Sequence, residues 1–191
     1  LGFAAKRTMS IAQRLYEGVD IGNGQEGLIT YMRTDSTRLS NDFIYAARDR
    51  IEQEYGKEYL GYYHAKNDAN AQDAHEAIRP TSIANTPEKI KDHLTNEQYR
   101  LYKMIYCRAL ASLMAPAKFN SVAVTLSQNG YDFTANGSTL TFDGYLKVYK
   151  AYDTSKDVVL PVLNESEQLV ATLLEKNQHF TEPPARYTEA K

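Results

Sequence analysis

Tyr31 and Arg33 are the two residues in this sequence whose types and spacing best suit covalent chemistry. They lie in the β-prone run 28–33, and residues two apart on a strand share one face. A phenol with a pKa of about 10 is a weak nucleophile at neutral pH, and a nearby cation favours its ionised form. The same guanidinium can bind a phosphate through two hydrogen bonds and stabilise charge on its oxygens. The pair therefore predicts attack on a phosphodiester, giving a phosphotyrosine ester that a hydroxyl can attack in return.

This spacing also has a simple structural explanation. The chain contains 15 tyrosines, and a Tyr-x-Arg sequence is commonly a packed strand residue beside a surface charge. The two residues by themselves leave both interpretations open.

A second group of polar residues follows in the segment Asp-Ala-His-Glu-Ala-Ile-Arg-Pro-Thr, at positions 73–81. In a helix, His75 and Arg79 would share a face at positions i and i+4. They could then bind a phosphate, with the imidazole donating a hydrogen bond. The alternative is a turn of surface helix in which Glu76 pairs with Arg79.

The sequence does not contain a recognisable metal-binding pattern. His64 and His75 are eleven residues apart and do not form a His-Glu-x-x-His motif. Asp68 and Asp73 flank a predicted loop that does not match a calcium-binding loop. The single cysteine, Cys107, excludes a cysteine-based zinc site and is interpreted as a buried core thiol. We predict that the residues of this chain bind no metal.

The two polar groups lie in a mostly helical half, residues 1–116. The start of the chain predicts a helix that ends at Gly18, and the glycine-rich segment 20–27 predicts a loop. Ser40 is the predicted N-cap of the next helix, which Gly56 ends.

Two more helices are predicted after the second polar group. A short helix is expected to begin at Pro87, because proline suits the first position of a helix. Thr95 and Gln98 form a capping box that begins a longer helix. Pro116 is expected to stop that helix.

The remaining residues, 117–191, show the alternating pattern of half-buried strands. Three pairs predict hairpin turns. They are Asn129-Gly130, Asn136-Gly137 and Asp143-Gly144. We expect an antiparallel meander that continues to Tyr152, with further strands at 158–163 and 168–174 and with edges that need partners from outside this chain. The predicted fold class is α+β.

Length and composition are those of a globular protein with one or two domains. The chain has 191 residues, of which 42% are hydrophobic and 24% charged, which excludes a disordered chain. Its apolar runs are too short for a membrane span or an export signal. The net charge of −2 weighs modestly against nucleic acid as a partner, although a local basic cluster can still bind it.

Three motifs, in this order, resemble the signatures of type IA DNA topoisomerases, specifically the bacterial topoisomerase I branch. The segment Ile-Thr-Tyr-Met-Arg-Thr-Asp-Ser at 29–36 is similar to the active-site signature, and 73–81 to the second. Phe-Thr-Glu-Pro-Pro-Ala-Arg-Tyr-Thr-Glu-Ala at 180–190 is similar to a third, and Ala-Gln-Arg-Leu-Tyr-Glu at 12–17 also fits. Met32 favours this branch over topoisomerase III, whereas a helicase module upstream would indicate reverse gyrase.

The resemblance implies a fold and an activity. Residues 1–116 would be most of the helical gate domain that carries the active-site tyrosine. Residues 117–191 would be an incomplete antiparallel β segment of the arch domain, in a ring-shaped enzyme. The enzyme would cut one DNA strand through a 5′-phosphotyrosine link at Tyr31, pass another strand and reseal the break. It would relax negative supercoils without ATP.

The matched motifs also imply roles for individual residues. Tyr31 would be the nucleophile, and Arg33 would position the scissile phosphate and the tyrosine. His75 would contact DNA near that phosphate. Arg79 would contact the DNA backbone or support the local structure, and Arg186 would be a structural or DNA contact.

The resemblance further implies partners and a cofactor. The partners would be single-stranded and negatively supercoiled DNA, bound by a monomer in the cytoplasm that associates with the nucleoid. Magnesium would be bound by the family's acidic Toprim domain, and no Asp-x-Asp-x-Asp cluster of that domain occurs in these 191 residues. We therefore expect an excised piece of the parent enzyme that carries no cofactor of its own. By itself it should neither relax nor efficiently cleave DNA.

Two alternatives come from other functional classes. A non-catalytic single-stranded DNA-binding module would use basic residues near the tyrosine, such as Lys6, Arg7 and Arg38, and would not need Tyr31. A hydrolase with His75 as its base would need a serine or cysteine nucleophile, for which the sequence has no convincing candidate.

Overall fold

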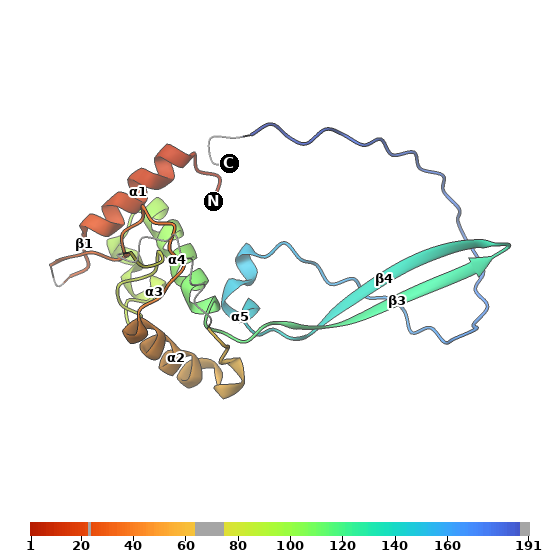
Figure 1. The fold of residues 1–191 in the computed structure, drawn as a ribbon, viewed down its shortest axis with the longest axis horizontal. Coiled ribbons are helices and arrows are strands. Elements are labelled where there is room, and N and C mark those ends of the chain that lie inside the picture. Colours follow the sequence, from red (N-terminus) through yellow and green to blue (C-terminus); the bar gives the residue numbers. More distant parts are fainter. Residues whose placement is uncertain (23, 64–74, 188–191) are drawn as a thin grey trace.

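A computed structural model describes residues 1–22, 24–63 and 75–187 of the chain. Helices gather on one side, and a long two-stranded hairpin projects away from them (Figure 1). The order of elements is α1 (Ala5–Glu17), β1 (Val19–Asp20), β2 (Gln25–Glu26), α2 (Asn41–Tyr55), η1 (Lys57–Tyr59), α3 (Pro87–Ile90), η2 (Lys91–His93), α4 (Asn96–Ala111), β3 (Lys118–Gln128), β4 (Tyr131–Phe142), α5 (Leu146–Tyr149) and η3 (Lys150–Tyr152), where η denotes a 3-10 helix. The α+β fold class is confirmed.

The helices begin and end close to the predicted signals, except that α4 ends at Ala111 and not at Pro116. Gly18 follows α1 with a φ of 126°, a conformation that suits glycine. Ser40 caps α2, and its hydroxyl accepts from the backbone N–H of Phe43 at 3.4 Å. Thr95 and Gln98 make the two reciprocal hydrogen bonds of the capping box at the start of α4. These boundaries depend on residues close together in the chain, which is why the sequence predicts them.

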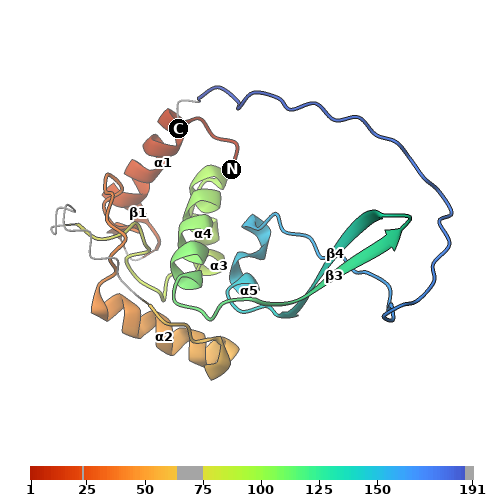
Figure 2. The same cartoon turned by 45° about the vertical axis from the view of Figure 1, so that its right-hand side comes forward.

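The helices share one hydrophobic core, and we call the described residues before Pro116 the helical body. Helices α1 and α4 run side by side (Figure 2). The core residues with no exposed surface include Leu15, Tyr102 and Leu113, and Cys107 of α4 is also buried. Leu28, Ile29 and Met32, the residues around Tyr31, are buried in the same core. The backbone that carries the tyrosine is therefore held by apolar packing.

Strands β3 and β4 form one antiparallel hairpin that turns at Asn129 and Gly130, with φ angles of 52° and 81°. The predicted meander is wrong at the other two pairs. Asn136 and Gly137 lie inside β4, and a Cβ on Gly137 would lie 3.0 Å from the carbonyl oxygen of Val158. That glycine therefore allows a close backbone approach and does not form a turn.

The third glycine pair joins the hairpin to the helical body. Gly144 has a φ of 48°, and a Cβ there would lie 2.4 Å from the carbonyl oxygen of Ala115. Helices α5 and η3 follow, where a strand was predicted as far as Tyr152. They pack back on α4, with the guanidinium of Arg108 5.3 Å from the ring centre of Tyr149. The predicted domain division at residue 116 stays a prediction.

The strands predicted at 158–163 and 168–174 do not form. In the described residues after Tyr152, the chain follows an extended path outside the helices and the hairpin (Figure 1). One bridge joins Ser138 to Val158. The side chains of Val170 and Leu174 are 89% and 81% exposed. A β-prone segment without a neighbouring strand cannot make ladder hydrogen bonds, which accounts for the error.

Candidate active site

Tyr31 follows a short antiparallel pairing of residues 28–30 with residues 79–81. The backbone hydrogen bonds run from Thr30 N to Arg79 O (3.0 Å) and from Thr81 N to Leu28 O (3.0 Å). The hydroxyl of Thr30 adds a bond to the carbonyl oxygen of Ala77 at 2.7 Å. The predicted strand 28–33 is reduced to a single bridge, and the chain bends after Tyr31. This pairing brings the two polar groups of the sequence together.

Two rings pack on the half-buried side chain of Tyr31. The ring of Tyr16, from α1, meets it edge-on, with 5.4 Å between the ring centres and 64° between the planes. The ring of His75 lies with its centre 5.4 Å away at a tilt of 41°. Sequence reasoning therefore identified His75 but missed Tyr16. The one signal for Tyr16 was its place in the segment 12–17 that resembles the family.

An open hollow of about 360 Å³ lies between α1 and the bend after Tyr31. It is lined by Met9, Ser10, Gln13, Glu17, Tyr31 and Arg33. Met9, Gln13 and Glu17 are four residues apart and share one face of the helix, and the Gln13 amide donates to the Glu17 carboxylate at 2.6 Å. Tyr31 and Arg33 thus border the same space, as predicted, although a bend and not a strand face brings them there. A phosphate in this hollow would meet the phenol and the guanidinium together.

Residues 75–79 do not form a helix, so the conditional prediction of a helix with His75 and Arg79 on one face is wrong. Two of their backbone N–H groups donate hydrogen bonds to residues in a distant part of the chain. The N–H of Ala77 donates to the carbonyl oxygen of Arg38 at 2.7 Å, and that of Arg79 to the hydroxyl of Thr30 at 3.0 Å. A helix would lose these bonds.

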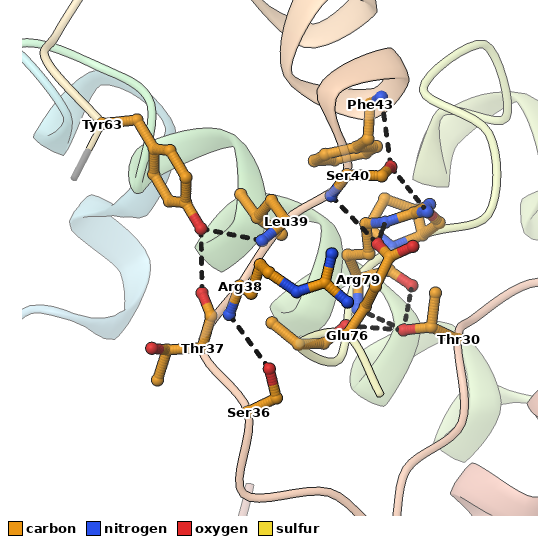
Figure 3. Close-up of polar contacts among 12 residues, drawn as sticks. Thr30, Ser36, Thr37, Arg38, Leu39, Ser40, Phe43, Tyr63, Glu76 and Arg79 are labelled. Atoms are coloured by element: carbon orange, nitrogen blue, oxygen red, sulfur yellow. Dashed lines mark hydrogen bonds and ion pairs between the residues drawn. The ribbon is translucent and has the colours of Figure 1, made fainter. Parts of the chain in front are cut away.

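The alternative is confirmed in its contact, at 2.9 Å between Glu76 Oε2 and Arg79 Nε (Figure 3). It is wrong in its surface helix turn, because the segment is not helical and the Arg79 side chain is 12% exposed. Burial of the Glu76 carboxyl opposes its ionisation. The hydrogen bond and charge of Arg79, the N–H of Ser40 and the charge of Arg38 outweigh that effect and hold its pKa below the usual value. The Arg79 guanidinium points into the protein, which favours local support among the two roles predicted for it.

Arg186 lies in the extended segment and is exposed. Within the described residues, no hydrogen bond or ion pair connects it to the tyrosine site, and its predicted role stays a prediction. Several residues named from the sequence fall outside the described part of the chain. They are His64, Asp68, Asp73 and the end of the third motif, 188–190.

The described residues do not fit a magnesium site. In residues 1–22, 24–63 and 75–187, no group of three or more histidine, cysteine, aspartate or glutamate side chains is placed to hold a metal ion.

Comparison with known proteins identifies the family. The whole chain, residues 1–191, matches a family described as DNA topoisomerase. The fold is similar to that of the full-length topoisomerase I from Thermotoga maritima, with a TM-score of 0.75 and 40% sequence identity. That match covers 87% of this chain and 26% of the T. maritima chain. The chain belongs to the DNA topoisomerase family. Its likeness to that enzyme makes it a member of the type IA class, as the motifs predicted.

Proposed function

We propose that Tyr31 is the nucleophile of a type IA topoisomerase reaction. Its phenol oxygen attacks a backbone phosphorus of one DNA strand, which forms a 5′-phosphotyrosine ester and releases the 3′ oxygen as a hydroxyl. The reverse attack by that hydroxyl reseals the strand and frees the tyrosine. The observation that carries this proposal is the position of Tyr31, beside Arg33 at one hollow and against the ring of His75.

Arg33 and His75 have separate roles in this proposal. The exposed side chain of Arg33 presents a planar fork that can bind two phosphate oxygens and stabilise charge as it develops on them. The imidazole of His75, against the tyrosine ring, contacts DNA close to the same phosphate. Both residues act on the DNA strand that occupies the hollow, without a hydrolysed nucleotide.

The activity of the whole enzyme is proposed from the family. It passes a second strand through the break and relaxes negatively supercoiled DNA, with single-stranded DNA as the form that it cleaves. We propose a monomer that acts in the cytoplasm in association with the nucleoid. None of the helices in the described residues is both long enough and apolar enough to cross a membrane.

We further propose that magnesium is bound by a Toprim domain outside these 191 residues. The 191-residue chain should then bind single-stranded DNA and not cleave it. Adding the Toprim domain of the same enzyme as a separate protein should restore a metal-dependent adduct on Tyr31. An adduct formed by the 191-residue chain in the presence of a chelator would contradict this division.

The covalent step is tested with Tyr31→Phe in the full-length protein. A single-stranded oligonucleotide labelled at its 3′ end reveals the protein adduct on a denaturing gel. The adduct should disappear, whereas the Kd for the oligonucleotide should change by less than about twofold, because the phenylalanine keeps the ring and loses only the nucleophile. Tyr45→Phe, on an exposed position of α2, is the matched control and should keep the adduct.

Two outcomes would count against the proposal. An adduct that persists in Tyr31→Phe, or that peptide mapping places on another side chain, excludes Tyr31 as the nucleophile. Binding without any adduct in the unchanged full-length protein, with magnesium present, favours the non-catalytic DNA-binding module.

A further inference from the structure

The loop that carries Tyr31 and Arg33, residues 31–37, is bound at both ends to one short segment, residues 76–81. Before the loop, residues 28–30 pair with residues 79–81. After the loop, the carbonyl oxygen of Arg38 accepts from the N–H of Ala77 at 2.7 Å. We call residues 31–37 the tyrosine loop. Its two ends are therefore fixed relative to each other by the segment that directly follows His75.

Side-chain contacts of Glu76 and Arg79 add to the backbone bonds that hold the two ends of the tyrosine loop (Figure 3). Glu76 Oε2 accepts from Arg79 Nε at 2.9 Å. Arg79 Nη2 donates to Ser40 Oγ at 3.1 Å, and Nη1 donates to the carbonyl oxygen of Pro80 at 2.9 Å. The guanidinium carbon lies 4.8 Å from the centre of the Phe43 ring. All three guanidinium nitrogens are thus bonded within the protein, and the side chain is 12% exposed.

Glu76 also joins this group to the N-terminus of α2. Its Oε2 accepts from the backbone N–H of Ser40 at 3.1 Å, and Ser40 is the residue that caps the helix. The positive end of a helix dipole favours a carboxylate at this place. The 15-residue helix α2 is packed in the core through Phe43, Ala47 and Ile51. Glu76 thereby anchors the segment after His75 to α2, which is packed in the core.

We propose that Glu76 and Arg79 are positioning residues that hold His75 against the Tyr31 ring and set the ends of the tyrosine loop, without touching DNA. The inference rests on the proposed function of Tyr31 and deepens it. His75 directly precedes Glu76 in the chain. The distance of 5.4 Å between the ring centres of Tyr31 and His75 therefore depends on where Glu76 is held. A displacement of about 1 Å in a catalytic group can cost about 100-fold in rate.

A positioning role and a DNA contact differ in how binding depends on salt. An arginine that neutralises a phosphate contributes about 0.7 to the slope of log K against log salt concentration for a single strand. An arginine that is held inside the protein through all three guanidinium nitrogens, and does not contact a phosphate, contributes nothing to that slope. The cleavage rate, by contrast, depends on either role.

The test uses the full-length protein with two substitutions, Arg79→Lys and Glu76→Gln. Lysine keeps the positive charge but lacks the planar fork that makes three directed contacts. Glutamine keeps the shape of Glu76 and one acceptor. Adduct formation on a single-stranded oligonucleotide is followed with protein in excess, which gives a rate constant and an amplitude separately. The Kd of the same oligonucleotide is measured at several salt concentrations.

Each substitution should lower the rate constant by about 10- to 100-fold at unchanged amplitude. The Kd should stay within about twofold, and the salt slope should stay the same. The double variant should be no slower than the slower single variant, because both changes act on the same Glu76–Arg79 contact. Arg50→Gln, which removes the guanidinium of the separate Arg50–Glu54 pair on α2, is the matched control and should leave the rate constant unchanged.

Three outcomes would overturn the inference. They are unchanged rate constants, a weaker Kd with a smaller salt slope, or a loss of amplitude alone, which is the sign of fewer folded molecules. If Arg79→Lys does not fold, the milder Glu76→Gln decides by the same criteria. Persistence of the adduct in Tyr31→Phe is a separate result, and it would count against the proposed function itself.

Discussion

The helical body and the β3–β4 hairpin differ in what their apolar side chains contact. In the body, Leu15 and Tyr102 have no exposed surface, whereas Tyr131 and Phe133 on the hairpin are 72% and 53% exposed. The body buries its apolar residues against one another. The hairpin presents them on a two-stranded ribbon, which is marginally stable by itself in water. We therefore expect its stability to depend on further surfaces that cover these side chains.

This difference separates the part of the molecule whose stability comes from packing within this chain from the part whose apolar side chains stay exposed. Tyr31, Arg33 and His75 all belong to the helical body, and the residues around Tyr31 are part of its core. In the described chain, the hairpin is met by a bridge from Ser138 to Val158 and, at its base, by the ring of Tyr59, 4.9 Å from that of Phe142. We expect other parts of the full-length enzyme to cover the hairpin and the segment that follows it.

Hydrogen exchange should show the widest contrast between the two regions. In the 191-residue chain, amides of α4 should exchange at least about 10³-fold more slowly than those of residues 160–174, because core helices open only with global unfolding at a cost of about 5 kcal/mol or more. Exchange followed by mass spectrometry checks this. Similar rates in both regions would contradict the comparison. Protection of residues 160–174 in the full-length protein would show that another part of the enzyme covers them.

Removal of a core side chain should be the next largest effect. Leu15→Ala should lower the free energy of unfolding of the helical body by about 2–5 kcal/mol, because it leaves a cavity in a closely packed core. Leu126→Ala, at a 41% exposed position of β3, should change it by less than about 0.5 kcal/mol. Urea unfolding followed by circular dichroism measures both. Equal losses would show that the hairpin belongs to the same cooperative unit.

The capping box of α4 should contribute less than a core side chain. Thr95→Ala removes the hydroxyl that accepts from the N–H of Gln98, and the free energy of unfolding should fall by about 1 kcal/mol. Thr125→Ala, on the exposed surface of β3, is the matched control and should have less than half that effect. The same urea titrations measure both changes. An unchanged free energy of unfolding in Thr95→Ala would mean that the stability of α4 does not depend on its cap.

Glu76 should produce the smallest effect, visible as a change with pH. Its pKa in the folded protein lies below the ordinary value of 4.5, as the contacts with Arg79 and Ser40 outweigh its burial. The stabilisation it provides is therefore present above about pH 4.5 and is lost as the pH falls through the lowered pKa. The difference in unfolding free energy between the unchanged protein and Glu76→Gln should shrink on acidification to about pH 3. A difference that stays constant from neutral pH would contradict this assignment.

Helix ends were predictable, and strand partners were not. Ser40 and Thr95 act on N–H groups three residues away, so the local sequence contains the whole interaction. The Asn129-Gly130 turn was predicted for the same reason, because both residues tolerate positive φ. The strand predicted at 168–174 had an apolar pattern but no neighbouring strand. At Gly137, the sequence could not show that the carbonyl of Val158 approaches.

The sequence by itself determined which residue types stand at the candidate site. Tyr31 and Arg33 are two residues apart and border one hollow, so their proximity follows from chain geometry alone. Tertiary structure decided that His75 meets the tyrosine and that Arg79 turns inward. Both depend on hydrogen bonds between segments such as Thr30 and Ala77, 47 residues apart in the chain. Contacts over that distance form only when the core brings the segments together, and no local pattern encodes them.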